Sequence, residues 1–363
     1  MSVRARCVSI SLVFATACAG PLPDPAEMAA RLPDGRAIDP VRRLQLDTEV
    51  EAARTQLAKG RLTEARSIAG RVLEFDPRDG RAMAIRAHCR LAIARESDPP
   101  ALDEYRAAEG ELRRASALAP DDPFVALLHA GFLVADGHLT AAAERIERAL
   151  VAAPNDVDLL ELGGRVRFDL GDEIAAIPLL SRRVALTTGD AASVWRLAQC
   201  HARLASSATD GVERARRAEA ARDAFRLHAA LAPDDVESLL GEAWAALLLL
   251  GERVDSTAIE PVLALYDRAA RLDPASPAPS FGRGIALARA GRDDEARAAW
   301  REALGLDSRH LPSLFELAAS LSAAGDAGAA RPLLRRALEL GPTDDERRRI
   351  EDWLREHGGA ESS

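Results

Sequence analysis

Residues 290–307 read Ala-Gly-Arg-Asp-Asp-Glu-Ala-Arg-Ala-Ala-Trp-Arg-Glu-Ala-Leu-Gly-Leu-Asp, and variants of this stretch recur along most of the chain. In each variant a glycine turn precedes a segment whose small and apolar residues recur every three or four positions, the spacing of one helix face. Equivalent turns lie at Gly60, Gly137 and Gly325. One helical unit is therefore repeated, which predicts an array of stacked helix pairs.

The composition excludes several classes of protein. The 363-residue chain is 48% hydrophobic but only 4% aromatic, and Ala, Leu, Arg and Glu, its dominant residues, are all good helix formers. We therefore expect an all-α protein. The net charge of −9 argues against non-specific binding to nucleic acid and against adhesion to anionic lipid headgroups. The expected partner is a protein or a peptide, with no nucleic acid.

The ends of the helix pairs give the period of the repeat. They fall at Pro77, Pro120, Pro154, Thr188, Pro233, Pro274, Ser308 and Pro342. Successive gaps are 43, 34, 34, 45, 41, 34 and 34 residues. The three longer gaps come from insertions near 96–104, 206–216 and 251–259. Each insertion is either a lengthened solvent loop or extra helical turn, or a protrusion that contacts a partner.

Three positions within the repeat keep the same character from copy to copy. Position 8 is small, as Ala53, Ala87, Ala130, Gly164, Ala198, Ala243, Gly284 and Ala318. Position 20 is Ala65, Ala108, Ala142, Ala176, Ala221, Val262, Ala296 and Ala330, and position 24 includes Phe225, Tyr266 and Trp300. A small residue where two helices cross lets their backbones approach, and a bulky neighbour fills the adjacent space.

With a 34-residue period and these positions in phase, residues 46–342 resemble a tetratricopeptide-repeat (TPR) protein of eight repeats. The resemblance implies a right-handed superhelical α-solenoid with a concave inner face. Residues 343–363 are predicted to form a capping helix, Thr343 to His357, and a disordered tail. We expect Trp353 and Leu354 of that helix to face inward.

The N-terminus has the pattern of an export signal. Arg4 and Arg6 precede a short apolar run, and residues 1–17 are predicted to be a signal peptide. Residues 15–18, Ala-Thr-Ala-Cys, resemble the lipobox of bacterial lipoproteins, with Ala15 where that motif usually has Leu. Cys18 is then the expected lipidation site and the membrane contact. Ala15-Thr16-Ala17 is also an ordinary cleavage site, so plain secretion stays open, as does the absence of export.

Residues 18–45 are rich in proline and predict a tether between the anchor and the first helix. Resemblance to Gram-negative lipoproteins, with Ala19 after the cysteine, implies an outer-membrane lipoprotein facing the periplasm. The alternative is a soluble periplasmic or secreted protein.

The chain contains no recognisable catalytic, cofactor or metal motif. It has no P-loop, no His-Glu-x-x-His and no Gly-x-Ser-x-Gly. The seven histidines form no ligand spacing with nearby Cys or carboxylates. Cys89 and Cys200 are expected to be small buried residues. We therefore expect no enzyme activity, no cofactor and no metal.

The concave face is the remaining candidate site. Positions 2, 5, 9 and 12 of each first helix form one stripe, and aromatic residues with arginine are typical of binding surfaces. The predicted groove consists of Phe124, Arg165, Trp195, Leu240, Trp244, Phe281 and Phe315, with Arg54 and Leu247 on the same stripe. The alternative follows from the family's core aromatic, which lies at position 4. A slip of one residue would place Trp195, Phe281 and Phe315 in the core.

These observations predict a non-enzymatic adaptor of the bacterial cell envelope that binds a protein segment in its concave groove. The alternative is a regulatory or accessory subunit of an envelope enzyme complex, for example in peptidoglycan turnover or secretion.

Overall fold

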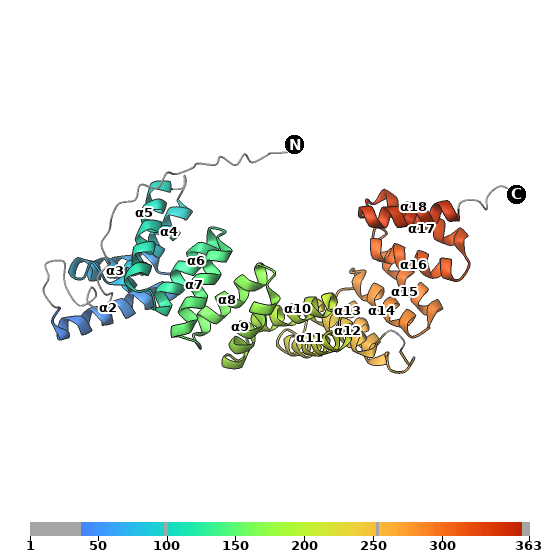
Figure 1. Ribbon diagram of the computed structural model, residues 1–363, viewed down its shortest axis with the longest axis horizontal. Coiled ribbons are helices and arrows are strands. Elements are labelled where there is room, and N and C mark those ends of the chain that lie inside the picture. Colours follow the sequence, from blue (N-terminus) through green and yellow to red (C-terminus); the bar gives the residue numbers. More distant parts are fainter. Residues whose placement is uncertain (1–37, 98–100, 252–253, 358–363) are drawn as a thin grey trace. The chain divides into compact units, whose positions relative to one another are not determined.

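The computed structural model describes residues 38–97, 101–251 and 254–357, and these residues form helices joined by short turns (Figure 1). The signal peptide, Cys18 and most of the predicted tether lie outside the described residues. The described chain contains no strand. It divides into two compact units, with the boundary after Phe132.

The first unit contains two complete helix pairs and most of a further first helix. Its helices are α2 (Pro40–Ala58), α3 (Leu62–Phe75), α4 (Gly80–Glu96), α5 (Leu102–Leu118) and the part of α6 (Pro123–Ala135) up to Phe132. The helix α2 packs against α3, α3 against α4 and α4 against α5, and α2 also contacts α4. First helix therefore stacks on first helix, as in a solenoid.

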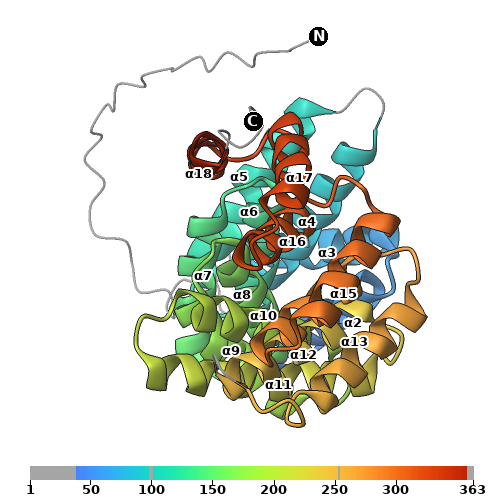
Figure 2. The same ribbon diagram turned by 90° about the vertical axis from the view of Figure 1, so that its right-hand side faces the viewer.

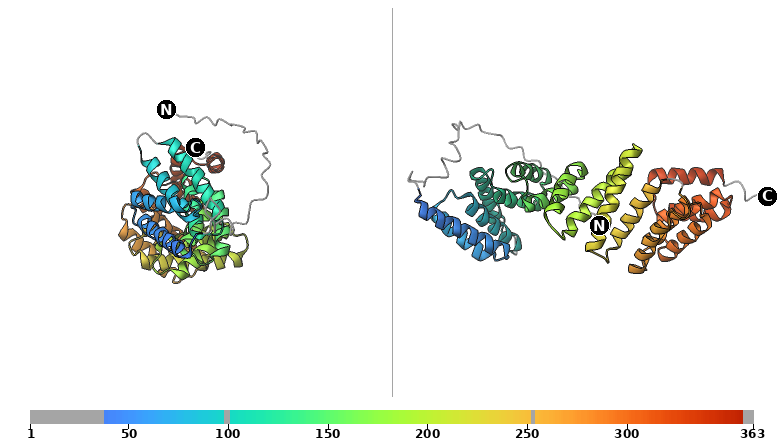
Figure 3. Two further views of the ribbon diagram at one scale, coloured as in Figure 1. Left: turned by 90° about the vertical axis from the view of Figure 1, so that its left-hand side faces the viewer. Right: turned by 90° about the horizontal axis from the view of Figure 1, so that it is seen from below.

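The second unit repeats the same arrangement. Its helices are α7 (Leu139–Ala152), α8 (Val157–Asp169), α9 (Glu173–Leu186), α10 (Ala191–Ser207), α11 (Gly211–Leu231), α12 (Val236–Leu250), α13 (Glu260–Leu272), α14 (Ala278–Arg289), α15 (Asp293–Leu306), α16 (Leu311–Ala323), α17 (Ala327–Glu339) and α18 (Asp344–Glu356). Each helix packs on the next, and α10 also contacts α8 and α12. Figure 3 shows the same helix pairs from two further sides.

The predicted all-α fold of stacked TPR-type helix pairs is confirmed, and the small residues explain it. The alanines at positions 8 and 20 are almost completely inaccessible to solvent. The glycines after five of the first helices all have positive φ, for example 71° at Gly291, so they end those helices as predicted. The last described helix, α18, begins with a capping box between Thr343 and Glu346. Ile350 is buried and Trp353 and Leu354 are half-buried.

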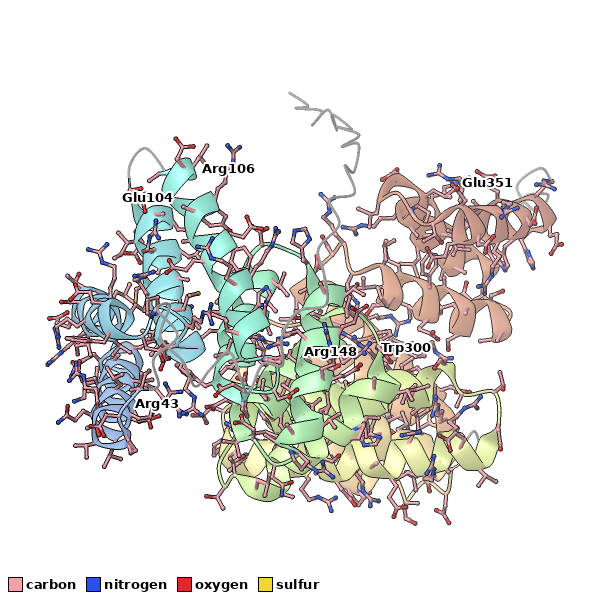
Figure 4. All side chains as sticks on the ribbon, turned by 60° about the vertical axis from the view of Figure 1, so that its left-hand side comes forward. Arg43, Glu104, Arg106, Arg148, Trp300 and Glu351 are labelled. Carbon is pink, nitrogen blue, oxygen red and sulfur yellow. The ribbon has the colours of Figure 1, made fainter. Side chains whose placement is uncertain are left out.

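The first helix begins earlier than predicted. The sequence placed the tether up to residue 45, but α2 begins at Pro40, a residue suited to the first helical position because it needs no N–H partner there. The Arg43 guanidinium lies 2.7 Å from Asp76 Oδ2 and ties this first turn to the end of α3. Arg43 is labelled in Figure 4.

The second insertion lengthens the helices on both sides of it. The helices α10 and α11, which flank residues 206–216, contain 17 and 21 residues, against 13 and 14 in α8 and α9 of the preceding repeat. Among the described residues of the third insertion, Ile259 is buried and the Val254 N–H donates to the Arg289 carbonyl at 3.3 Å. These features fit the extra-turn interpretation, while contact with a partner stays a prediction.

At position 27 five repeats carry alanine, whereas two carry a polar side chain, Arg183 and His228; the alanines are Ala115, Ala149, Ala269, Ala303 and Ala337. Arg183 donates to Asp190 Oδ2 at 2.8 Å, and His228 Nδ1 lies 2.5 Å from Ser238 Oγ. In both repeats the contact reaches the first turn of the next first helix. The two departures from the family pattern are therefore polar links between successive repeats.

Candidate binding face of the first helices

The structure fixes which side chains of the first helices belong to the core. Position 4 is buried at Val194, Leu239, Ser280 and Leu314. Position 5, one residue later, is half-buried at Trp195, Leu240, Phe281 and Phe315. The position-5 side chains therefore lie at the edge of the core with one side accessible. This is the geometry of the groove alternative, although the binding role itself stays a prediction.

The other predicted groove residues divide between exposed and buried positions. Phe124, Arg165 and Trp244 are half-buried. The Arg54 guanidinium lies 4.7 Å from the centre of the Phe124 ring, a cation–π contact within the first unit. Leu247 is only 2% exposed, so its placement on the stripe was wrong. It belongs to the core cluster that also contains Ile259, a residue of the insertion after α12.

The position-5 aromatics contact other rings across successive helices. Trp195 on α10 meets Phe168 on α8 edge-on, with 5.9 Å between ring centres. Phe281 on α14 meets the His310 ring at 5.2 Å. The Arg203 guanidinium lies 4.5 Å from the centre of the Phe168 ring. These contacts hold the rings in place without burying them, which suits surfaces that bind with little loss of side-chain entropy.

One cavity lies between α10 and α12 and has a volume of about 240 Å³. It is lined by Gln199, Ala202, Arg203 and Ser206 of α10, Phe225 of α11, and Glu237, Leu240, Gly241 and Trp244 of α12. Two predicted groove residues, Leu240 and Trp244, are among them. The buried Phe225 ring forms its floor because Gly241 leaves room for it: a Cβ at Gly241 would lie 2.5 Å from the ring.

A second, larger cavity of about 530 Å³ lies between α16 and α18. It is lined by Leu311, Pro312, Phe315, Glu316, Ala318 and Ala319 of α16, Leu334 of α17, and Glu346, Arg349, Ile350 and Trp353 of α18. Its volume falls within the range of small-ligand and side-chain pockets. The predicted groove residue Phe315 lies on its wall. The helices α17 and α18 are adjacent in Figures 1 and 2.

A third cavity, of about 320 Å³, lies between α14 and α16 and includes Trp300 and Glu316 in its lining. Trp300 is 2% exposed and its indole ring packs on Gly284, where a Cβ would lie 2.3 Å from Nε1. In Figure 4 Trp300 lies among the helices, while Glu351 lies at the outer surface of α18. Glu316 therefore lines two neighbouring cavities.

The three cavities share one construction. Each lies between two successive first helices, and each is floored by the position-24 residue of the intervening second helix: Phe225, Trp300 and Leu334. The capping helix α18 lines its cavity through the same repeat positions as a first helix does. Counting on by 34 residues, Glu346, Arg349, Ile350 and Trp353 hold positions 2, 5, 6 and 9, the positions through which α12 lines its cavity. In this respect α18 is a ninth first helix.

Sequence reasoning missed two residues of this face. Trp353 was interpreted as an inward residue of a cap, yet it holds the same repeat position as Trp244, and continuing the 34-residue period past Pro342 would have identified it. Glu316 was not identified because position 6 is otherwise occupied by Gly241 and Gly282 in the two preceding first helices. No local pattern indicates that its carboxylate lines a cavity.

The described residues offer little reactive chemistry. Cys89 and Cys200 are buried free thiols, as expected, and burial raises their pKa values to about 11 and about 12. Such thiols are protonated and poorly nucleophilic at neutral pH. Within the described part of the chain no cluster of His, Cys, Asp and Glu suits a metal ion. No described helix is both long and apolar enough to cross a bilayer.

Several solved structures of TPR proteins are similar to parts of this chain. No protein-family model and no curated protein matches the chain. A TPR protein of Cytophaga hutchinsonii aligns with 74% of this chain and 99% of its own at 15% identity and a TM-score of 0.48. PilF of Pseudomonas aeruginosa aligns with 66% and 96% at 19% identity and 0.46. YrrB, described as a TPR protein with an unusual peptide-binding site, aligns with 56% and 96% at 14% identity and 0.46.

Proposed function

We propose that the chain is a non-enzymatic scaffold that binds a protein segment along the accessible face of its first helices. The observation that carries the proposal is the construction of that face. Half-buried aromatic side chains at positions 5 and 9 flank cavities of about 240 and 530 Å³. Rigid aromatics beside concave, mostly apolar pockets are the usual anchors of protein recognition.

The proposal includes a location in the bacterial cell envelope, with Cys18 as a lipid anchor and the helices in the periplasm. It is supported by the sequence of residues 1–18 alone. A Cys18→Ser variant tests the anchor. We expect the variant to move from the membrane fraction to the soluble periplasmic fraction. Retention of the variant in the membrane fraction would show that Cys18 is not the anchor.

Protein binding is tested by crosslinked capture from an envelope fraction with four baits: wild type, Trp244→Ala, Phe315→Ala and Leu227→Ala. Trp244 lines the α10–α12 cavity, whereas Leu227 is 45% exposed on α11 and lines none of the three cavities. We expect a defined protein captured by wild type and by Leu227→Ala and lost with Trp244→Ala. Melting curves recorded in parallel show whether each bait is folded.

Two outcomes would contradict the proposal. One is capture of the same proteins by Trp244→Ala and wild type, together with equal capture by Phe315→Ala, because neither cavity would then be involved. The other is an enzymatic activity that copurifies with the wild-type chain through every step.

A further inference from the structure

The carboxylate of Glu316 has no partner in the described chain. It is half-buried, and it makes no hydrogen bond or ion pair to any described residue. Burial raises its pKa, and no neighbouring cation offsets that effect. A carboxylate that is partly shielded from water and has no compensating contact is less favourable than a paired one, so this side chain is free to accept a donor that the isolated chain does not supply.

The three buried carboxylates of the described residues are paired. Glu111, 1% exposed, is bonded by Arg86 and Arg90. Arg226 Nε donates to Glu242 at 2.8 Å, and Arg43 Nη1 donates to Asp76 at 2.7 Å. The half-buried Glu316 has no such partner, and neither do the half-buried Glu49 and Glu161, but of these three only Glu316 lines one of the three cavities described above. Two arginines line its cavities, and of these Arg297 is engaged with Ser320 at 3.1 Å and Asp294 at 2.5 Å.

The surroundings of Glu316 define what fits. The α16–α18 cavity is walled by Leu311, Phe315, Leu334, Ile350 and Trp353. A lysine or arginine has an apolar stem and a cationic head, so its stem matches this lining and its head matches the carboxylate. Two aromatic rings on the walls add attraction for a cation. An anionic or purely apolar side chain would leave the Glu316 carboxylate unpaired.

We propose that the α16–α18 cavity binds a partner segment presenting a lysine or arginine flanked by apolar residues, with Glu316 receiving the cation. This inference rests on the proposed scaffold function and specifies the chemistry of the partner at one cavity. Arg349, exposed on the opposite wall of the cavity, provides the competing possibility: it could instead close an internal ion pair with Glu316.

The test is a selection of random 12-residue peptides displayed on phage against the full chain. Four versions are compared: wild type, Glu316→Gln, Arg349→Gln and Trp244→Ala. We expect wild type to enrich peptides with Lys or Arg between apolar residues. Glu316→Gln should keep the apolar preference and lose the basic one. An individual peptide should lose about tenfold in affinity on Glu316→Gln, as when a partly desolvated charge pair loses one partner. Melting curves confirm that each version is folded.

The outcomes separate the proposals. Loss of the basic preference with Glu316→Gln but not with Arg349→Gln supports the inference. Enrichment of basic peptides that is equal on wild type and Glu316→Gln overturns it, as does wild-type enrichment without any basic preference. If peptides depend on Trp244 and not on Glu316, the scaffold function stands and this inference fails. If no version enriches any peptide, both fail.

Discussion

The α10–α12 and α16–α18 cavities use the same repeat positions but differ about twofold in volume, roughly 240 against 530 Å³. The two cavities also differ in the residues at two of these positions. In the smaller cavity the floor is the Phe225 ring, which packs on Gly241, whereas in the larger one the floor is Leu334 and position 6 is Ile350. The capping helix α18 also packs less closely on α17 than α12 packs on α11, so the size of a cavity depends on how the helices pack as well as on the residue at position 24.

The largest expected effect comes from truncating Phe225, the bulkier of the two position-24 side chains compared here. Phe225→Ala deletes a buried ring that packs against Ala198, Ala221 and Ala245, and we expect it to destabilise the second unit by about 3–5 kcal/mol. Urea unfolding followed by circular dichroism measures the loss. Leu334→Ala should cost less, about 2 kcal/mol, because Leu334 already borders the larger cavity. If both variants unfold like wild type, the position-24 residues are not core floors.

The second prediction tests the close contact between Gly241 and the Phe225 ring. A Cβ at Gly241 would lie 2.5 Å from Phe225, so Gly241→Ala should destabilise by about 1–3 kcal/mol through overpacking. Combining it with Phe225→Leu should recover most of that loss, since the smaller side chain makes room.

A matched glycine provides the control for this experiment. Gly110 lies inside α5 with no atom within 4 Å of an added Cβ. There Gly110→Ala should stabilise by about 0.5–1 kcal/mol, because alanine favours the helix. The two identical substitutions are therefore expected to have opposite signs. A stabilising effect at Gly241 would refute the close contact with the ring.

Two titratable side chains, His201 on α10 and Glu316 on α16, should also respond oppositely to acid. In α10, burial and then Arg217 and Arg216 lower the pKa of His201 to about 4. Its folded pKa lies below the ordinary 6.5, so its contribution to stability is complete above pH 6.5 and is lost as the pH falls toward 4. In α16 burial raises the pKa of Glu316, so acid relieves an unfavourable charge there.

Melting temperatures at pH 7.5 and pH 5 of wild type, His201→Gln and Glu316→Gln test this contrast. Because the His201 ring is partly exposed, we expect wild type to lose about 2–4 °C more than His201→Gln on acidification, equivalent to roughly 1 kcal/mol. Glu316→Gln should melt slightly higher than wild type at pH 7.5. Equal acid sensitivity of wild type and His201→Gln would contradict the assignment to His201.

The repeat itself was predictable because its determinants are local. A small residue at position 8 lets two helix backbones approach each other, and a glycine after the first helix adopts a positive φ. Both residue types recur at fixed positions of the repeat, so the sequence alone reveals them. The register of the binding face, that is, whether position 4 or position 5 is buried, could not be predicted, because the two positions are adjacent and both carry apolar residues. Only packing shows that Leu314 is core and Phe315 is at its edge.

Features that depend on distant segments could not be predicted either. Leu247 is buried in a cluster to which Ile259 of the insertion also belongs, and no pattern within α12 indicates that. The unpaired state of Glu316 depends on which groups α14 and α18 bring to it. The role of α18 was hidden because no second helix follows it among the described residues, so the repeat signature ends one helix early.

The smallest expected effect concerns how α18 is held in place to form the larger cavity. Trp353 Nε1 donates to Ser322 Oγ at 3.0 Å, linking α18 to α16. Ser322→Ala removes this acceptor. Because Trp353 is only half-buried, water replaces the lost contact, and the cost should be about 0.5 kcal/mol.

A change of that size is too small to measure well by global unfolding, so the measurement is amide hydrogen exchange of α18. Exchange in α18 should become about twofold faster, while exchange in α10 and α12 is unchanged. Unchanged exchange in α18 would mean that the Trp353–Ser322 contact does not hold the helix, and that apolar packing and the bond from Arg331 to the His357 carbonyl fix the wall carrying Trp353.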